Sequence, residues 1–302
     1  MRVHHLTCIS TCPLGGRLFD GRTPGLFQRG RLTCHCVLVE GPDSLVLIDT
    51  GLGRFDVADP ASRLSRFFLF LVRPEFREEM TAYRQIQRLG FDPRDVRHVV
   101  LSHLDFDHAG GLDDFPWATV HMLEDERRSA VAQRTLLDRM RYRPQQWGTM
   151  ASWKTYRPAE GDRWFGFDSV RQLAGAPPEV LLVPLVGHTL GHAGVAIRIS
   201  GRWLLLAGDA YFYRGEMDPD RPYCTPGLRF YQWMMEKDRA ARLENQRRLR
   251  ALGRVAGGAV DIFCSHDVAE FERLAGRPAS IPTSWIPAGL GRRPHEAPPL
   301  GA

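Results

Sequence analysis

The chain has 302 residues, 43% of them hydrophobic and 25% charged, which is enough for one large domain with a real core. The net charge of +5 comes almost entirely from scattered arginines, because Lys154 and Lys237 are the only lysines. A nucleic-acid-binding surface needs a concentrated basic stripe, so we expect no nucleic-acid partner.

The first ten residues, MRVHHLTCIS, contain no apolar core of signal-peptide length. The longest apolar run, 67–72, is far short of the ~20 residues that span a bilayer. We therefore expect a cytoplasmic protein without a membrane partner. The cysteines lack the paired spacing of a structural zinc site and are too few for a dense disulfide framework, so we expect free or buried thiols. They are Cys8, Cys12, Cys34, Cys36, Cys224 and Cys264.

The hydrophobic pattern predicts strands that first pair as a hairpin and then alternate with helices. The hairpin joins 34–40 to 44–50 through the turn residues GPD. In chain order, the elements that follow are a helix at 78–90 closed by Gly90, strands at 96–102 and 118–123, a helix at 124–140, strands at 179–187, 193–200 and 202–209, a helix at 237–253, a strand at 259–265 and a short helix after it.

This order predicts an α/β architecture with mixed sheets covered by helices. No repeat or linker divides the chain, so we expect a single domain over 1–275. The segments 54–78 and 141–178 do not fit the sheet framework and are predicted to be loop insertions. The tail, 276–302, is rich in Pro and Gly and is expected to be poorly ordered.

Possible metal ligands recur where predicted strands end, and loops at strand ends are where binding groups collect on a rigid scaffold. One histidine after one strand would carry no information, but five strand ends that all finish in His or Asp are hard to ascribe to chance. The residues are Asp49, the group His103, Asp105, Asp107 and His108, then His188, Asp209 and His266.

With these residues in place, the chain resembles the metallo-β-lactamase-fold metallohydrolases. The family motif HxHxDH, followed by a distant His, Asp and His, is similar to HLDFDH (103–108), GHTLGH (187–192), GDA (208–210) and SHD (265–267), with LIDTG (47–51) upstream. The resemblance implies a four-layered αββα sandwich with a metal site at one edge of the two sheets.

By position, the resemblance implies two metal ions. His103, Asp105 and His188 would hold the first ion, Asp107, His108 and His266 the second, and Asp209 would bridge them. Asp49 would orient a ligand histidine through its other ring nitrogen. Thr189 and His192 are interpreted as residues that shape a loop.

Asp105 departs from the family, which has histidine at this position. Three ligand carboxylates and four neutral histidines facing two divalent ions would leave one positive charge. More oxygen and less imidazole favours iron or manganese over zinc, the family default, and added negative charge should raise the pKa of a bound water. The alternative is that the Asp105 carboxylate does not reach the first metal ion and that the first site stays vacant.

We expect hydrolysis, in which a metal-bridging hydroxide attacks an ester, lactone or thioester carbonyl and an aspartate, Asp107 or Asp209, or a metal-bound water protonates the leaving group. The motifs look most like the acyl-homoserine lactonase group. Those enzymes carry an oxyanion-binding tyrosine three residues after the bridging aspartate, where this chain has Phe212, so Tyr211 or Tyr213 is the candidate. The alternatives are a phosphodiester hydrolase and a di-iron oxidoreductase or oxygenase, since the flavodiiron branch has Glu where Asp105 stands.

The expected partner is a small, partly apolar substrate. The segment 66–76 and the tryptophans of 141–178 would wall a pocket above the metals. An equally weighted alternative is that such segments, with 229–235, form the contact of a homodimer.

Overall fold

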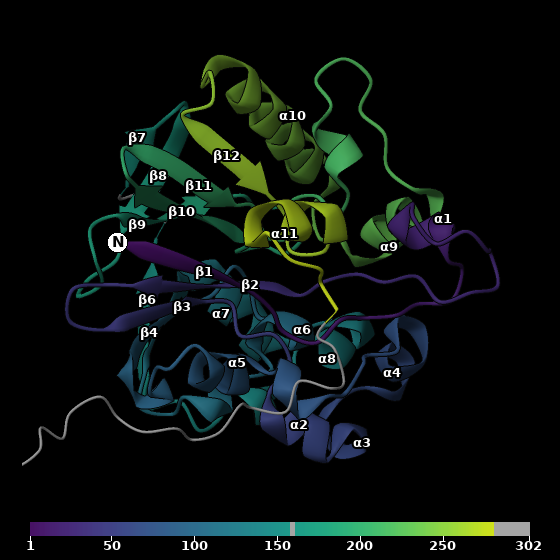
Figure 1. The fold of residues 1–302 in the computed structure, drawn as a ribbon, viewed down its shortest axis with the longest axis horizontal. Coiled ribbons are helices and arrows are strands. Elements are labelled where there is room, and N and C mark those ends of the chain that lie inside the picture. The colour runs from purple at the N-terminus through teal and green to yellow at the C-terminus, as the bar shows by residue number, and fades with distance from the viewer. Residues whose placement is uncertain (158–160, 281–302) are drawn as a thin grey trace, which may run out of the picture.

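The structure is a computed structural model that describes residues 1–157 and 161–280. Its centre consists of two six-stranded mixed sheets that face each other (Figure 1). The first sheet runs in the order β1 (Arg2–Thr7), β2 (His35–Glu40), β3 (Leu45–Ile48), β4 (Val96–Val100), β5 (Thr119–Leu123), β6 (Ser152–Tyr156). The second runs β12 (Val260–Phe263), β11 (Arg202–Leu206), β10 (Ala193–Ile199), β9 (Val180–Pro184), β8 (Phe167–Gln172), β7 (Asp162–Trp164).

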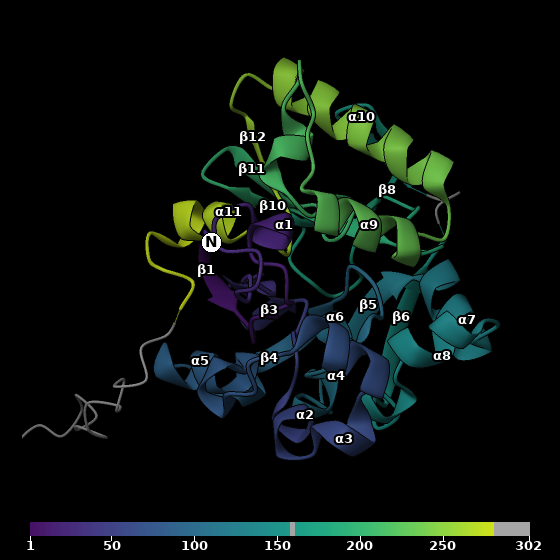
Figure 2. The ribbon, with the colours of Figure 1, turned by 90° about the vertical axis from the view of Figure 1, so that its right-hand side faces the viewer.

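Helices cover the outer face of each sheet (Figure 2). Those of the first half of the chain are α1 (Arg17–Asp20), α2 (Arg54–Ala58), α3 (Pro60–Arg63), α4 (Arg66–Val72), α5 (Ala82–Arg88), α6 (Phe106–Ala109), α7 (Glu124–Ala132) and α8 (Leu136–Arg141). Those of the second half are α9 (Pro226–Met235), α10 (Arg239–Val255) and α11 (Val268–Ala275). Short 3-10 turns lie at Glu78–Met80, Pro93–Asp95, Leu112–Asp114, Pro144–Gln146 and Arg214–Met217.

Strand β3 shows how the layers form. Its side chains alternate, so that Leu45 and Leu47 pack in the outer core against the helices while Val46 and Ile48 pack in the core between the sheets. Because both faces of β3 are covered, its sequence is an unbroken apolar run. On the far side of the second sheet, Leu249 of α10 packs in a third core. The expected four-layered αββα sandwich is therefore confirmed.

The direction of the strands brings the predicted ligands to one edge. β3 is parallel to β4, and β11 is parallel to β12. β9 and β11 are both antiparallel to β10 and therefore run the same way. The carboxyl ends of these strands thus open to the same edge of the sandwich, where the following loops carry His and Asp.

One predicted helix, 124–140, is two helices in the structure. Gln133 adopts a left-handed backbone with a φ of 41°, which ends α7. Thr135 then caps α8: its hydroxyl accepts from the amide of Asp138, whose carboxylate accepts in return from the amide of Thr135. The sequence pattern of this capping box is a Thr followed three residues later by an acidic residue.

The prediction that the segments 54–78 and 141–178 are loops was wrong, because both contain regular secondary structure. The segment 54–78 folds into α2, α3 and α4, and the segment 141–178 contributes β6, β7 and β8. β6 and β7 are edge strands and β8 lies next to β7. All three carry exposed polar residues, so their sequence lacks the apolar run of a central strand. Strand β1 was missed for the same reason. Of the predicted tail, 281–302 lies outside the described residues.

Within the described part of the chain, none of the helices combines the length and the apolar character needed to cross a bilayer.

Replacing Thr135 by Ala removes the cap of α8 and should lower the free energy of unfolding by about 1 kcal/mol. Thr135→Ser keeps a hydroxyl that can accept the same bond and should stay close to the native chain. Urea unfolding of the three proteins measures this. Equal midpoints for the native chain and Thr135→Ala would show that the cap contributes nothing.

Candidate metal centre

All the residues predicted as metal ligands lie together, almost completely buried, at the edge where β4, β9, β11 and β12 end. Their potential ligand atoms form three groups, each with its atoms within 4.8 Å of one another. The groups are His103, Asp105 and His188; His103, His108 and Asp209; and Asp107, His108 and His266. Asp209 thus shares a group with His103, which also belongs to the first group, and with His108, which also belongs to the third.

The group around His108 and His266 has the spacing of a metal site. The Oδ1 atom of Asp209 lies 3.3 Å from Nε2 of His108 and 3.1 Å from Nε2 of His266, and Asp107 Oδ2 lies 3.9 Å from the latter. Ligands about 2.1 Å from a tetrahedral zinc ion are about 3.4 Å apart. Neither His108 Nε2 nor Asp209 Oδ1 finds a hydrogen-bond partner among the described residues, so both lone pairs are free for a cation.

The other ring nitrogens of these histidines are held by hydrogen bonds. Nδ1 of His108 lies 2.9 Å from Asp49, and Nδ1 of His266 lies 2.7 Å from the backbone oxygen of Thr33. Asp49 also accepts from the amide and the hydroxyl of Ser102, while its own backbone is left-handed with a φ of 51°. These contacts orient both rings so that Nε2 of each histidine faces the centre of the group, as hydrogen bonds to the outer ring nitrogen do in metal sites.

The same group holds an excess of negative charge. Burial opposes protonation of His108, yet the carboxylates of Asp209 and Asp107 raise its pKa well above the usual value. The pKa of His266 is raised against burial by the same two carboxylates. A divalent cation would supply the charge that the histidines otherwise take up as protons. The donor set and the charge therefore both fit a metal ion.

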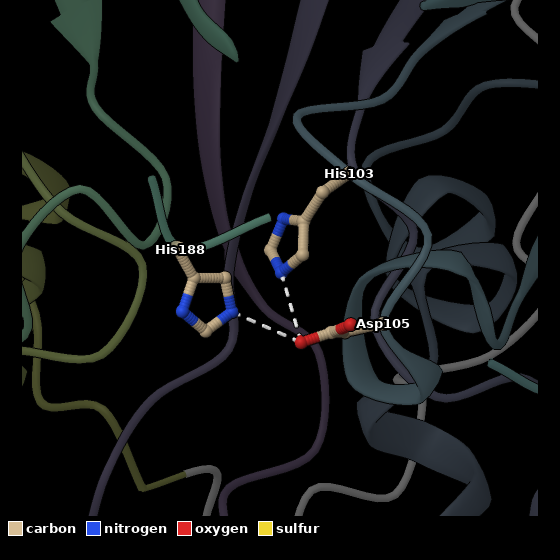
Figure 3. Close-up of side chains that lie close together, drawn as sticks. All are labelled: His103, Asp105 and His188. Atoms are coloured by element: carbon tan, nitrogen blue, oxygen red, sulfur yellow. Dashed lines mark hydrogen bonds and ion pairs between the residues drawn. The ribbon is translucent and has the colours of Figure 1, made fainter. Parts of the chain in front are cut away.

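The group around Asp105 also has suitable distances (Figure 3). Asp105 Oδ2 lies 3.4 Å from Nε2 of His103 and 3.0 Å from Nε2 of His188. Asp209 Oδ2 lies 3.7 Å and 3.5 Å from the same two nitrogens. Asp105 thus reaches the position that the sequence assigned to it.

Arg141, the last residue of α8, is a charged group at this site that the sequence analysis missed. Its guanidinium is fully buried and binds both carboxylate oxygens of Asp105, with Nε 2.6 Å from Oδ1. Nη2 also lies 2.9 Å from Nε2 of His188. Although burial opposes it, Arg141 holds the pKa of Asp105 well below its usual range. Nothing in the sequence around Arg141 distinguishes it from the many other arginines.

Glu126 of α7 ties together the two loops that carry the first group. Its buried carboxylate accepts from the Thr189 hydroxyl at 2.5 Å, from the Gly191 amide and from the Leu104 amide. His192 accepts from the Asp209 amide through Nε2 and lies 2.9 Å from the Leu185 oxygen. Thr189 and His192 therefore shape the loops, as the sequence suggested.

The two candidate tyrosines are placed differently from what was expected. Tyr211 is fully buried and donates to Glu270 at 3.0 Å, and Tyr213 packs against Arg214 and Tyr223. Phe212 between them stacks on the His266 ring, with centroids 4.9 Å apart. The hydroxyl of Tyr211 is engaged with Glu270 in the core, which argues against its contact with a substrate.

A narrow apolar pocket opens onto Asp107 and His266. Its volume is 20 Å³. Neither Tyr211 nor Tyr213 is among the described residues that line this pocket. Its other walls are Thr11, Pro13, Phe19, Leu32, Leu71, Val72, Phe212, Leu228 and Tyr231. A larger cavity of 520 Å³ between β1, α5 and α11 contains none of the candidate ligands.

The walls come partly from the segments suggested by the sequence. Leu71 and Val72 belong to the apolar run of 66–76, and Tyr231 to 229–235. The tryptophans of 141–178 behave otherwise: Trp147 and Trp153 pack against the core beneath the first sheet, and Trp164 packs in the core of the second sheet. All six cysteines are free thiols. The thiol of Cys34 donates to the backbone oxygen of Asp107 at 2.7 Å.

Known proteins resemble this chain over most of its length. Residues 29–251 match the Metallo-beta-lactamase superfamily. Probable metallo-hydrolase Rv2300c of Mycobacterium tuberculosis is 39% identical over 267 residues, covering 88% of this chain and 80% of the relative. N-acyl homoserine lactonase AiiA of Bacillus thuringiensis subsp. kurstaki is 27% identical over 203 residues, covering 67% and 72%.

Solved structures share the fold. An N-acyl homoserine lactone hydrolase, with the product N-hexanoyl-L-homoserine bound at its catalytic metal centre, aligns with a TM-score of 0.66 at 22% identity over 90% of this chain and 95% of the other. The dizinc quorum-quenching lactonase AidC aligns with a TM-score of 0.54 at 18% identity over 87% and 86%. The family match over residues 29–251 and the relative that is 39% identical over 88% of this chain show that the chain belongs to the metallo-β-lactamase superfamily.

Proposed function

We propose that the chain is a metal-dependent hydrolase that cleaves a carbonyl ester, lactone or thioester of a small, partly apolar substrate. The observation that carries this proposal is the group of Asp107, His108 and His266, whose ligand atoms lie within 4.8 Å of one another and which borders an apolar pocket. Asp209 Oδ1 lies 3.3 Å and 3.1 Å from the Nε2 atoms of the two histidines. A divalent ion bound there supplies a hydroxide near neutral pH and polarises a carbonyl oxygen.

Zinc is the metal that we propose for this group. Imidazole nitrogens and carboxylate oxygens are both donors that zinc accepts, and this group offers two of each. The expectation of iron or manganese rested on Asp105, which adds an oxygen ligand in place of an imidazole. Arg141 binds both oxygens of Asp105, and Asp105 is not one of the four residues proposed here, so that reason does not apply to this group.

Asp107 is the carboxylate that we assign to proton transfer. It lines the pocket and is 8% exposed, whereas the described pocket lining does not include Asp209. A carboxyl group at this place can hand a proton to the leaving oxygen or sulfur of a substrate in the pocket. Asp209 lies between the two ligand groups and is suited to holding them together.

Tyr231 of α9 is the hydroxyl group that we assign to the carbonyl oxygen. Its ring packs edge-on against Phe212, with centroids 5.7 Å apart, and it lines the pocket with Asp107 and His266. Burial, together with the nearby carboxylates of the metal centre, raises the pKa of Tyr231 well above its usual value. The phenol therefore keeps its proton at neutral pH and can donate a hydrogen bond to a developing oxyanion.

The pocket supports a substrate with an apolar arm. Its lining includes Leu71, Val72 and Leu228, and its volume of 20 Å³ has room for about one water molecule. An acyl chain would have to displace the side chains of α4 and α9 to enter. Lactones with an acyl chain are the class to test first, because N-acyl homoserine lactonases are among the relatives.

The hydrolase proposal is tested by screening zinc-loaded protein against lactones, thioesters, phosphodiesters and β-lactams. His266→Ala removes a ligand and should lower both bound zinc and kcat/KM, the latter more than about 100-fold, because even outer partners of a metal matter by 10–100-fold. His4→Ala, a change at a histidine paired with Glu40 away from the site, is the control. Turnover that survives in His266→Ala would contradict the proposal.

The role of Tyr231 is tested with Tyr231→Phe, which keeps the ring and removes the donor. We expect kcat to fall about 100-fold with little change in KM, as when an oxyanion donor is lost. Tyr213→Phe serves as the matched control and should retain full activity. If instead Tyr213→Phe slows the reaction and Tyr231→Phe does not, the assignment is reversed.

A further inference from the structure

The first ligand group already contains a cation. The guanidinium of Arg141 binds both oxygens of Asp105, and its Nη2 lies 2.9 Å from Nε2 of His188. Asp105 Oδ2 and His188 Nε2 are the same atoms that would face a metal ion in this group. The acceptor nitrogen of a neutral imidazole has one lone pair, so His188 Nε2 cannot accept from the guanidinium and bind an ion at the same time. At Asp105 Oδ2 the guanidinium takes one of two lone pairs and places a positive charge beside the position of the ion.

The backbone holds Arg141 in this place. Tyr142, the next residue, forms an antiparallel bridge with Asp105, so the end of α8 lies directly beside the loop of Asp105. Nη1 of Arg141 also donates to the Met235 oxygen at 2.7 Å. The guanidinium is fully buried and contacts Asp105, His188 and the Met235 oxygen. Moving it away from these groups would leave a charge without a partner in the core.

The charges balance with one metal ion. Asp105, Asp107 and Asp209 contribute three negative charges, and Arg141 cancels the charge of Asp105. One divalent ion neutralises the remaining two, whereas two divalent ions would leave a net charge of +2 on the ions, these three carboxylates and Arg141. In the part of the chain that the structure describes, no guanidinium competes with an ion at Asp107, His108, Asp209 and His266. His108 Nε2 and Asp209 Oδ1 accept no hydrogen bond from any described residue.

We propose that Arg141 takes the place of the first metal ion and that the chain binds a single divalent ion, held by Asp107, His108, Asp209 and His266. Arg141 is a positioning residue in this arrangement: it supplies the fixed positive charge that orients Asp105 and His188. The proposal rests on the proposed function only in that a metal binds at this site.

The test is the number of ions bound by the full chain. Metal-free protein is titrated with Co²⁺ or Zn²⁺, and bound metal is measured by elemental analysis after gel filtration. We expect about one ion per native chain and about two per chain of Arg141→Met, in which the lone pairs of Asp105 and His188 are released. Arg143→Met, a change at a half-buried arginine two residues along that binds only backbone oxygens in the described contacts, should stay at one.

A second measurement uses the native chain alone and is independent of how Arg141→Met folds. Cobalt-loaded native protein should show the paramagnetic resonance of an isolated Co²⁺ ion at every loading. Coupled ions, or two equivalents bound with similar affinity, would overturn the proposal, as would a single equivalent in folded Arg141→Met. Neither experiment involves turnover, so a failed substrate screen leaves this result standing and the reverse also holds.

Discussion

Three carboxylates, Asp105, Asp107 and Asp209, are buried at the meeting point of two β-sheets. Buried like charges are unfavourable unless each is paired, and this constraint explains the surroundings of the site. Arg141 pairs with Asp105, and the histidines His108 and His266 face Asp209. The charge that remains on Asp107 and Asp209 creates the demand for a metal ion.

The same constraint explains why so many contacts lie behind the ligands. Asp49 tolerates a left-handed backbone to reach His108 and Ser102, and Glu126 joins the loops of Leu104 and Thr189. Such contacts hold each ligand nitrogen in one orientation. The rigidity comes from the sheets, whose parallel strand ends deliver the loops to one edge.

The ligand residues could be predicted from the sequence because they follow directly after apolar strands, and the spacing within HLDFDH is local. Arg141 could not, because its contact with Asp105 spans 36 residues and depends on where α8 ends. Tyr231 was visible only as part of an aromatic run, since nothing in the sequence shows that α9 turns this ring toward Asp107. Edge strands such as β6 were not predicted, because one side of each is exposed and apolar and polar residues are mixed along its sequence.

Arg141 also changes the expected chemistry at the metal. Three carboxylates around the ions would weaken them as Lewis acids and raise the pKa of a bound water. With Asp105 neutralised by a guanidinium, the residues that would hold an ion are Asp107, His108, Asp209 and His266, and the two carboxylates among them would balance its charge. The fixed charge of Arg141 nearby then adds to the attraction for a hydroxide. Asp105 therefore departs from the usual histidine without making the centre richer in negative charge, because the residue that compensates it lies 36 positions further along the chain.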